Sequence, residues 1–141
     1  MRYKDPSLQI LKAATELLSD SVVYDGQVIY AGTRIPRNKK NYIQIYIESI
    51  MNKNTGDSMI YDVALAFQCV TIQSSSEGDE TPLNSIFEQV IARVDAPENY
   101  VMTDFNCVMA EFGDSEYNNE LLDANYMISR KLRIILFIEQ K

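Results

Sequence analysis

The 141-residue sequence contains no histidine, the side chain that most often acts as a general base near neutral pH and the commonest metal ligand. It also lacks the glycine-rich phosphate loops and the nucleophile motifs of common enzyme classes. Both absences argue against hydrolase chemistry. We therefore predict that the protein is not an enzyme and that it uses no metal or other cofactor.

Cysteine is scarce as well, and the two that are present, Cys69 and Cys107, lie far apart in segments that resemble strands. Metal sites and redox motifs use cysteines in close pairs, which this sequence does not contain. We interpret both residues as free thiols that pack as small apolar groups in the core.

Long apolar runs are also missing. No run approaches the roughly 18 to 20 residues that a membrane span requires, and an Asp-Pro pair at residues 5–6 precedes any possible signal-peptide core. The length predicts one domain, residues 1–141, that buries about two thirds of its unfolded surface. The formal net charge of −7 disfavours tight non-specific DNA binding. We expect a soluble, intracellular protein without membrane contact.

Two segments have the periodicity of amphipathic helices. Asp5 and Pro6 are typical of a helix start, which predicts a helix over residues 6–19. Thr81 and Pro82 start a second helix in the same way, which we expect over residues 82–94. The apolar stripes are Ile10, Leu11, Ala14, Leu17 and Leu18 in the first helix, and Leu83, Ile86, Phe87, Val90, Ile91 and Val94 in the second.

The remaining sequence is typical of strands joined by turns. Asp25-Gly26 favours a two-residue turn in a small N-terminal hairpin. Longer strand-like runs occupy residues 42–48, 59–72, 105–112 and 126–140. Only one connection between these runs is helical, which predicts an α+β fold with an antiparallel four-stranded sheet and two helices packed on one face.

Both faces of the predicted sheet carry apolar side chains. In the second long run Val63 and the residues at alternate positions from it lie on one face. Ile60, Ala64, Val70 and Ile72 lie on the other. Two helices on one side cannot cover the second face. Burial of about 500 Å² of it would contribute on the order of 12 kcal/mol before association costs. Self-association is the simplest way to cover this surface.

The segment "RIPRNKKN", residues 34–41, carries four positive charges and no acid. Proline at position 36 excludes a regular element, so the segment is a basic loop. It is either a solvated connector or a patch that contacts an acidic neighbour or a phosphate backbone.

Two acidic segments, "SSSEGDET" and "GDSEYNNELLDAN", are predicted to be polar loops, with residues 114–125 forming a long hairpin loop. The spacing of the acids does not match a calcium-binding loop. In an assembly, one subunit's basic loop would contact a neighbour's acidic loop, or the acids would line a channel. The predicted interface residues are Arg34, Arg37, Lys39, Lys40, Tyr46, Ile60, Val70, Ile72, Asp114, Glu116, Tyr117, Glu120 and Asp123.

The order of the segments "DPSLQILKAATELL", "VIYAGTRIP", "YIQIYIESI", "DVALAFQCVTI", "PLNSIFEQVIARV" and "RKLRIILFIEQ" resembles the tail terminator or tail completion proteins of tailed bacteriophages. The resemblance covers nearly the whole chain. It implies a ring, commonly hexameric, at the head-tail connector (neck) or tail end. Genomic DNA would pass through its channel without sequence-specific binding, and other neck or tail proteins would attach to it. The implied location is the virion, after assembly in the host cytoplasm.

Two alternatives from other classes remain open. One is a small non-viral α+β adaptor or chaperone module, which would be monomeric or dimeric and would bind its partner in a groove. The other is a carboxylate-dependent enzyme, which requires two acids that converge in a pocket and a raised carboxyl pKa.

Overall fold

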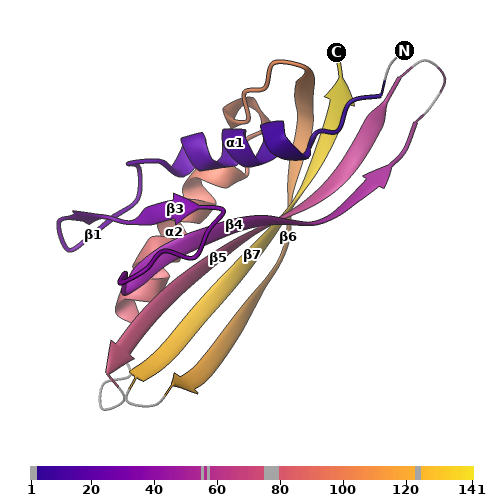
Figure 1. The fold of residues 1–141 in the computed structure, drawn as a ribbon. Helices are drawn as coiled ribbons and strands as arrows, with labels where there is room; N and C mark the ends of the chain where they lie inside the picture. The colour runs from indigo at the N-terminus through magenta and orange to yellow at the C-terminus, as the bar shows by residue number, and fades with distance from the viewer. Residues whose placement is uncertain (1–2, 55, 57, 75–79, 123–124) are drawn as a thin grey trace.

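The computed structural model describes residues 3–54, 56, 58–74, 80–122 and 125–141. Its elements are α1 (Ser7–Leu18), β1 (Val23–Tyr24), β2 (Gln27–Val28), β3 (Tyr30–Gly32), β4 (Asn41–Asn52), β5 (Ile60–Ser74), α2 (Thr81–Val94), the 3-10 helix η1 (Pro97–Asn99), β6 (Phe105–Leu122) and β7 (Asn125–Gln140). Figure 1 shows a long, strongly twisted sheet with α1 and α2 on the same face.

The main sheet has the strand order β3-β4-β5-β7-β6. β3 runs parallel to β4, whereas the other neighbours are antiparallel. The prediction of an α+β fold with a four-stranded antiparallel sheet is therefore wrong, because the structure is mostly β with a five-stranded mixed sheet and a separate two-stranded hairpin. The three residues of β3 are too few to show a period-2 pattern, and their pairing with residues 42–44 depends on tertiary packing.

The separate hairpin, β1 and β2, turns at Asp25 and Gly26. Both residues have positive φ, 53° and 75°, as a two-residue type I′ turn requires. The side chain of Gln89 in α2 holds the hairpin in place: its Oε1 accepts from the Val23 amide at 3.0 Å, and its Nε2 donates to the Val23 carbonyl at 2.9 Å. The hairpin is thus attached to the helical layer beside β3.

The sequence predicts a hairpin loop over the acidic residues 114–125. The structure corrects this prediction, because β6 continues to Leu122 and pairs with β7 up to Asn125. The pairing shifts register between Cys107 and Met109 and again between Phe112 and Ser115. At the second shift, a Cβ on Gly113 would lie 2.9 Å from the carbonyl oxygen of Arg133, so glycine permits the close approach of the two strands. Irregularities of this kind bend and twist an edge strand.

The two helices begin and end close to the predicted boundaries. Asp5 Oδ1 accepts hydrogen bonds from the amide of Ser7 at 2.9 Å and from its hydroxyl at 2.6 Å, which organises the start of α1. The apolar stripes of both helices pack on the sheet face formed by alternate residues of β4, β5 and β7. The core residues of that face include Ile43, Ile45, Val63, Leu65, Phe67, Cys69, Leu132, Ile134, Leu136 and Ile138, all 0% exposed.

Both cysteines are free thiols, with Cys69 buried and Cys107 half-buried. Burial raises the pKa of Cys69 to about 12 and that of Cys107 to about 11. At about pH 8 only ~0.01% of Cys69 and ~0.1% of Cys107 would be thiolate, the reactive form. We expect a thiol reagent to label the native protein slowly, Cys107 first, and both residues at once after unfolding in denaturant. Rapid labelling of both thiols in the native protein would contradict this packing.

Candidate functional site

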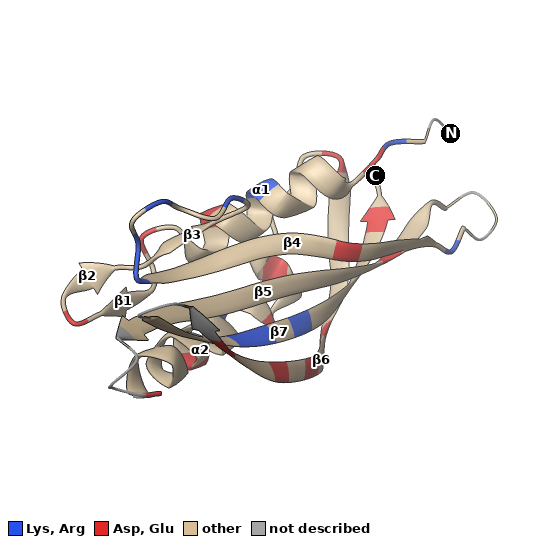
Figure 2. Ribbon diagram, turned by 60° about the horizontal axis from the view of Figure 1, so that its bottom comes forward, with Lys and Arg blue, Asp and Glu red and all other residues tan. Residues whose placement is uncertain are grey.

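The candidate site is the face of the sheet opposite the helices, which we call the helix-free face. It consists of alternate side chains on β4, β5, β7 and β6, because successive side chains of a strand point to opposite faces. Its centre is polar, as Figure 2 shows by the basic positions on β7 beside the acidic positions on β6. The register aligns Tyr46, Ala66 and Arg133 in one row and Gln44, Gln68, Lys131 and Glu116 in the next.

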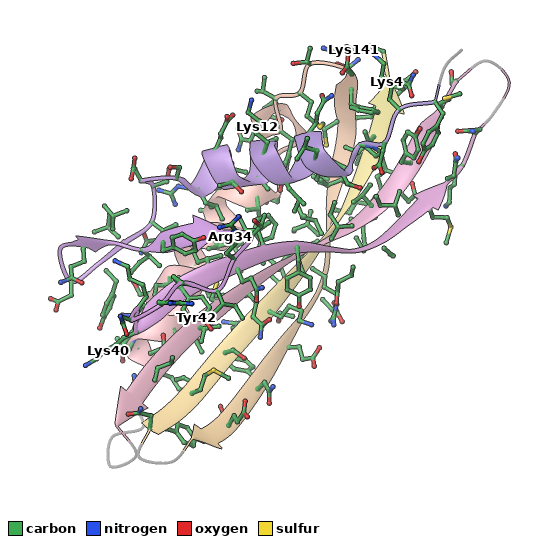
Figure 3. The ribbon with its side chains drawn as sticks, viewed as in Figure 1. Lys4, Lys12, Arg34, Lys40, Tyr42 and Lys141 are labelled. Atoms are coloured by element: carbon green, nitrogen blue, oxygen red, sulfur yellow. The ribbon has the colours of Figure 1, made fainter. Side chains whose placement is uncertain are left out.

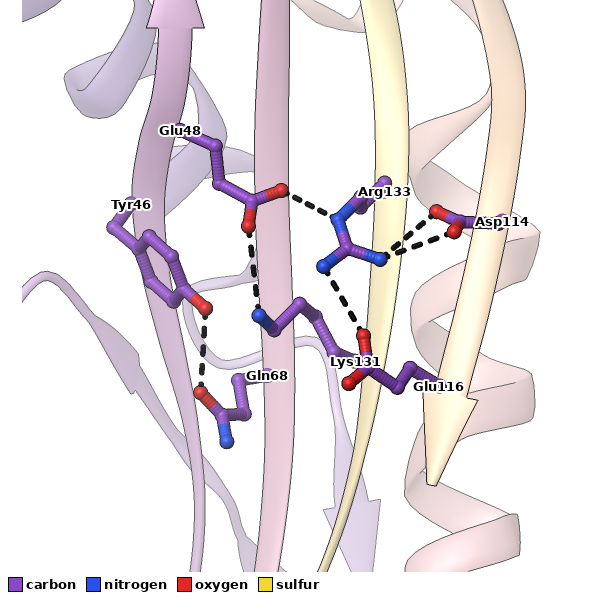
Figure 4. A network of polar contacts seen from close by, with 7 residues as sticks. All are labelled: Tyr46, Glu48, Gln68, Asp114, Glu116, Lys131 and Arg133. Atoms are coloured by element: carbon purple, nitrogen blue, oxygen red, sulfur yellow. Dashed lines mark hydrogen bonds and ion pairs between the residues drawn. The ribbon is translucent and has the colours of Figure 1, made fainter. Parts of the chain in front are cut away.

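Arg133 is the hub of an ion-pair network on this face (Figure 4). Its Nε donates to Glu48 Oε1 at 2.6 Å, its Nη1 to both oxygens of Asp114 at 3.1 Å, and its Nη2 to Glu116 Oε2 at 3.1 Å. Lys131 Nζ also contacts Glu48, at 3.4 Å. The network therefore joins β4, β7 and β6 through side chains, in addition to the backbone ladder.

Small residues on β5 make this network possible. Glu48 and Arg133 belong to strands on either side of β5, and Ala66 pairs with Arg133 on one side and with Tyr46 on the other. An alanine methyl is short enough for long side chains to meet above it. Ala66 is 0% exposed although no helix covers it, so part of the apolar surface on this face is covered within the subunit.

The electrostatics of the network differ from those of an acid-base catalyst. The hydrogen bond from Arg133 holds the pKa of Glu48 below its ordinary value, with further contributions from the positive charges of Lys131 and Arg133. A general acid requires a raised carboxyl pKa. The three carboxylates that converge here share a cation, which favours a structural role for this cluster over the carboxylate-enzyme alternative.

Replacing Arg133 should change how the thermal stability of the subunit depends on pH. The depressed pKa of Glu48 means that its stabilising contribution is present above its ordinary pKa of 4.5 and is lost as pH falls through the lower folded value. We expect Arg133→Met to lower the thermal unfolding midpoint near pH 7 and to flatten its decline as the pH falls below the ordinary glutamate pKa of 4.5. Lys12→Met, which removes an exposed cation from α1, is the matched control. Parallel pH profiles for wild type and Arg133→Met would contradict the assigned ion pairs.

Four of the predicted interface residues lie on the β4 and β5 part of the helix-free face. The Tyr46 hydroxyl lies 3.4 Å from Gln68 Oε1, and Lys131 Nζ lies 5.5 Å from the centre of its ring. Ile60 and Ile72 are partly exposed, whereas Val70 is 3% exposed and packed within the subunit. The structure thus places Tyr46 at the edge of the network and the isoleucines towards the two ends of β5.

The predicted interface residues of the acidic segment are on β6. Asp114 and Glu116 bind Arg133, while Glu120 is exposed farther along the strand. Asp123 lies outside the described residues. Tyr117 is on the helix side of β6, where its ring lies 4.7 Å from the Arg130 guanidinium and its hydroxyl lies 3.4 Å from Asn84 Oδ1.

The basic loop lies at the opposite side of the sheet, between β3 and β4. Arg34, Arg37, Lys39 and Lys40 are all exposed. The loop and the β2 end of the hairpin together border an open hollow of about 320 Å³, lined by Gln27, Val28, Ile29, Asn38, Lys39, Lys40 and Asn41. The structure therefore places the four cations along one edge of the sheet, where Figure 3 labels Arg34 and Lys40, and separates them from the acids of β6.

Sequence reasoning did not identify the centre of the network, Glu48, Lys131 and Arg133. The signal available for two of them is the segment "SRKLRIIL", in which basic residues alternate with buried Leu132 and Ile134. This alternation places both cations on the face away from the helices. Their partners cannot be predicted without the strand register.

The described residues contain no group of three or more metal-ligating side chains that could hold a metal ion. No helix within the described ranges is long and apolar enough to cross a membrane.

Comparison with known proteins shows a shared fold. No family model matches the chain, and no curated protein sequence matches it. Among solved structures, a chain in the virion of a native gene transfer agent (GTA) particle is similar, with a TM-score of 0.70 and 15% sequence identity. The match covers 94% of this chain and 95% of the other. At this identity the match shows a common fold over nearly the whole length of both chains.

Proposed function

We propose that the protein is a structural component of a phage-like virion, a ring subunit at the neck or tail end that joins head and tail. The ring would leave a central channel for the genome, and we propose no catalytic role. The observation that carries the proposal is the fold shared with a virion chain over 94% of this protein. The sequence resemblance to tail terminator and tail completion proteins supports the same assignment and favours six subunits.

The charge distribution supports passage of DNA without tight binding. The chain has a formal net charge of −7, and clustered cations facing the phosphates would be needed for strong non-specific binding. We propose that the ring contacts other neck or tail proteins, that it is located in the virion, and that it assembles in the host cytoplasm.

Measuring the mass of the purified protein in solution tests the proposal. We expect an assembly of about six times the 16.1 kDa chain mass, in a concentration-dependent equilibrium with smaller species. Added duplex DNA at physiological salt should not bind to the ring. A monomer or dimer at every concentration would contradict the ring and favour the alternative of a small protein-binding adaptor.

A further inference from the structure

The two edges of the main sheet carry opposite charges. β6 forms one edge and β3 the other. The acids of β6 are Glu111, Asp114, Glu116 and Glu120, and this strand contains no basic residue. The basic loop, which in the structure spans residues 33–40 between β3 and β4, contains four cations and no acid. Figure 2 shows the basic loop beside β3 and the acidic positions on β6 across the sheet.

Several of these charges have no ion-pair partner among the described residues. Asp114 and Glu116 bind Arg133, but Glu111 and Glu120 form no ion pair with any described residue. The same is true, in the part of the chain that the structure describes, of the four exposed cations of the basic loop. Four strand spacings of ~4.8 Å separate the two edges, about 19 Å of sheet. The two sets of charges therefore cannot neutralise each other within one subunit.

Exposed apolar side chains gather at the same two edges. Of the twelve exposed large apolar residues among those described, three lie on the hairpin and the basic loop, and four lie on β6. The first group is Val23, Val28 and Ile35, and the second is Val108, Met109, Phe112 and Tyr117. The hairpin and the basic loop line one continuous hollow, so they form a single surface. Each edge thus combines apolar contact area with charge of one sign.

We propose that the β6 edge of one subunit docks against the basic loop and hairpin of a second copy of this chain, in a head-to-tail arrangement. This contact rests on the proposed ring and identifies the surfaces that build it. Pairing two β6 edges would place acids against acids, which is unfavourable in neighbouring strands. A contact between two different surfaces instead uses each edge once per subunit and closes into a ring when the rotation permits.

Charge reversal tests the contact. The acid-edge variant carries Glu111→Lys and Glu120→Lys, which leaves the Arg133 network intact. The basic-loop variant carries Arg34→Glu, Arg37→Glu, Lys39→Glu and Lys40→Glu, because all four cations must be reversed to make the loop acidic. Each variant alone places like charges across every contact, and we expect it to raise the concentration at half-assembly about tenfold or more. A chain carrying all six substitutions, or an equal mixture of the two variants, restores opposite charges and should assemble as the wild type does. The control Glu16→Lys/Glu88→Lys makes the same charge change on exposed helix positions and should leave assembly unchanged.

The measurement is oligomer mass over a dilution series, with circular dichroism to establish that each variant is folded. Weakened assembly in both variants and recovery in the six-substitution chain supports the head-to-tail contact. A wild-type ring with unchanged assembly in both variants, or no recovery in the six-substitution chain, overturns the contact but leaves the ring intact. A wild-type protein that stays monomeric at every concentration overturns the proposed ring and the contact together.

Discussion

Replacing Phe87 by alanine is expected to lower the free energy of unfolding of the subunit by about 3–5 kcal/mol. Phe87 is 1% exposed and lies in the middle of the apolar stripe of α2. Its ring also supports the Arg130 guanidinium, whose Cζ lies 3.7 Å from the ring centre. The substitution leaves a cavity and removes the aromatic face from a cation whose Nε is buried without a hydrogen-bond partner among the described residues.

The prediction is measured by urea unfolding at a protein concentration below assembly, so that association does not contribute to stability. Phe112→Ala is the matched control, because this phenylalanine is 51% exposed on the edge strand. It should cost less than about 1 kcal/mol in the isolated subunit. Equal losses for the two variants would show that α2 does not pack on the sheet as described.

Replacing Phe112 by serine is expected to weaken assembly by up to about 70-fold while the subunit remains folded. A phenylalanine buries roughly 150–250 Å² when fully covered, so covering the exposed half of this ring removes about 100 Å² of apolar surface from water. At about 25 cal/mol per Å², this contributes about 2.5 kcal/mol per contact. The expected loss exceeds that of any single exposed ion pair, which is about 0–1 kcal/mol.

Leu8→Ser provides the control for this variant, because Leu8 is 78% exposed and belongs to α1, not to β6, the hairpin or the basic loop. Oligomer mass over a dilution series should show a shift of the assembly midpoint for Phe112→Ser and no shift for Leu8→Ser. If both variants assemble as the wild type does, the β6 edge is not the surface that holds the subunits together.

The sequence predicts the parts of the fold that have a long periodic pattern. The stripe from Leu83 to Val94 predicts α2 to within one residue of its observed start, since every member of a long stripe adds to the same signal. The last strand is also recognisable from residues 126–140. Polar and apolar side chains alternate in part of this segment and the rest is continuously apolar, as expected of a strand near the middle of a sheet. In both cases local sequence and tertiary environment favour the same structure.

The missed parts depend on contacts between distant segments. β3 has three residues and exists because β4 lies beside it. The outer half of β6 is rich in aspartate, asparagine and glutamate, which have low strand propensity, so its sequence is typical of a loop. It remains a strand because it pairs with β7 up to Asn125 and because Arg133 binds Asp114 and Glu116. Long-range pairing thus outweighs local propensity.

The sequence predicts the charged segments of the candidate site but not how the fold arranges them in space. Arg34, Arg37, Lys39 and Lys40 are recognisable as a basic cluster from their spacing alone. That the cluster and the acids of β6 lie on opposite edges of one sheet follows from the strand order, which places β6 beside β7 and β3 beside β4. No local pattern encodes this order, so the sequence predicts a contact between a basic and an acidic segment of neighbouring subunits but not that the two segments lie on opposite edges of one sheet.

Electron microscopy of the purified wild-type protein tests the central claim most directly. We expect averaged images to show closed rings with a central opening and a single number of subunits, six by our proposal. The basic-loop variant, imaged at the same protein concentration, should form fewer rings than the wild type. Images that show only small compact particles without an opening, even at protein concentrations well above those at which rings are expected, would contradict the assignment of this chain as a ring-forming virion protein.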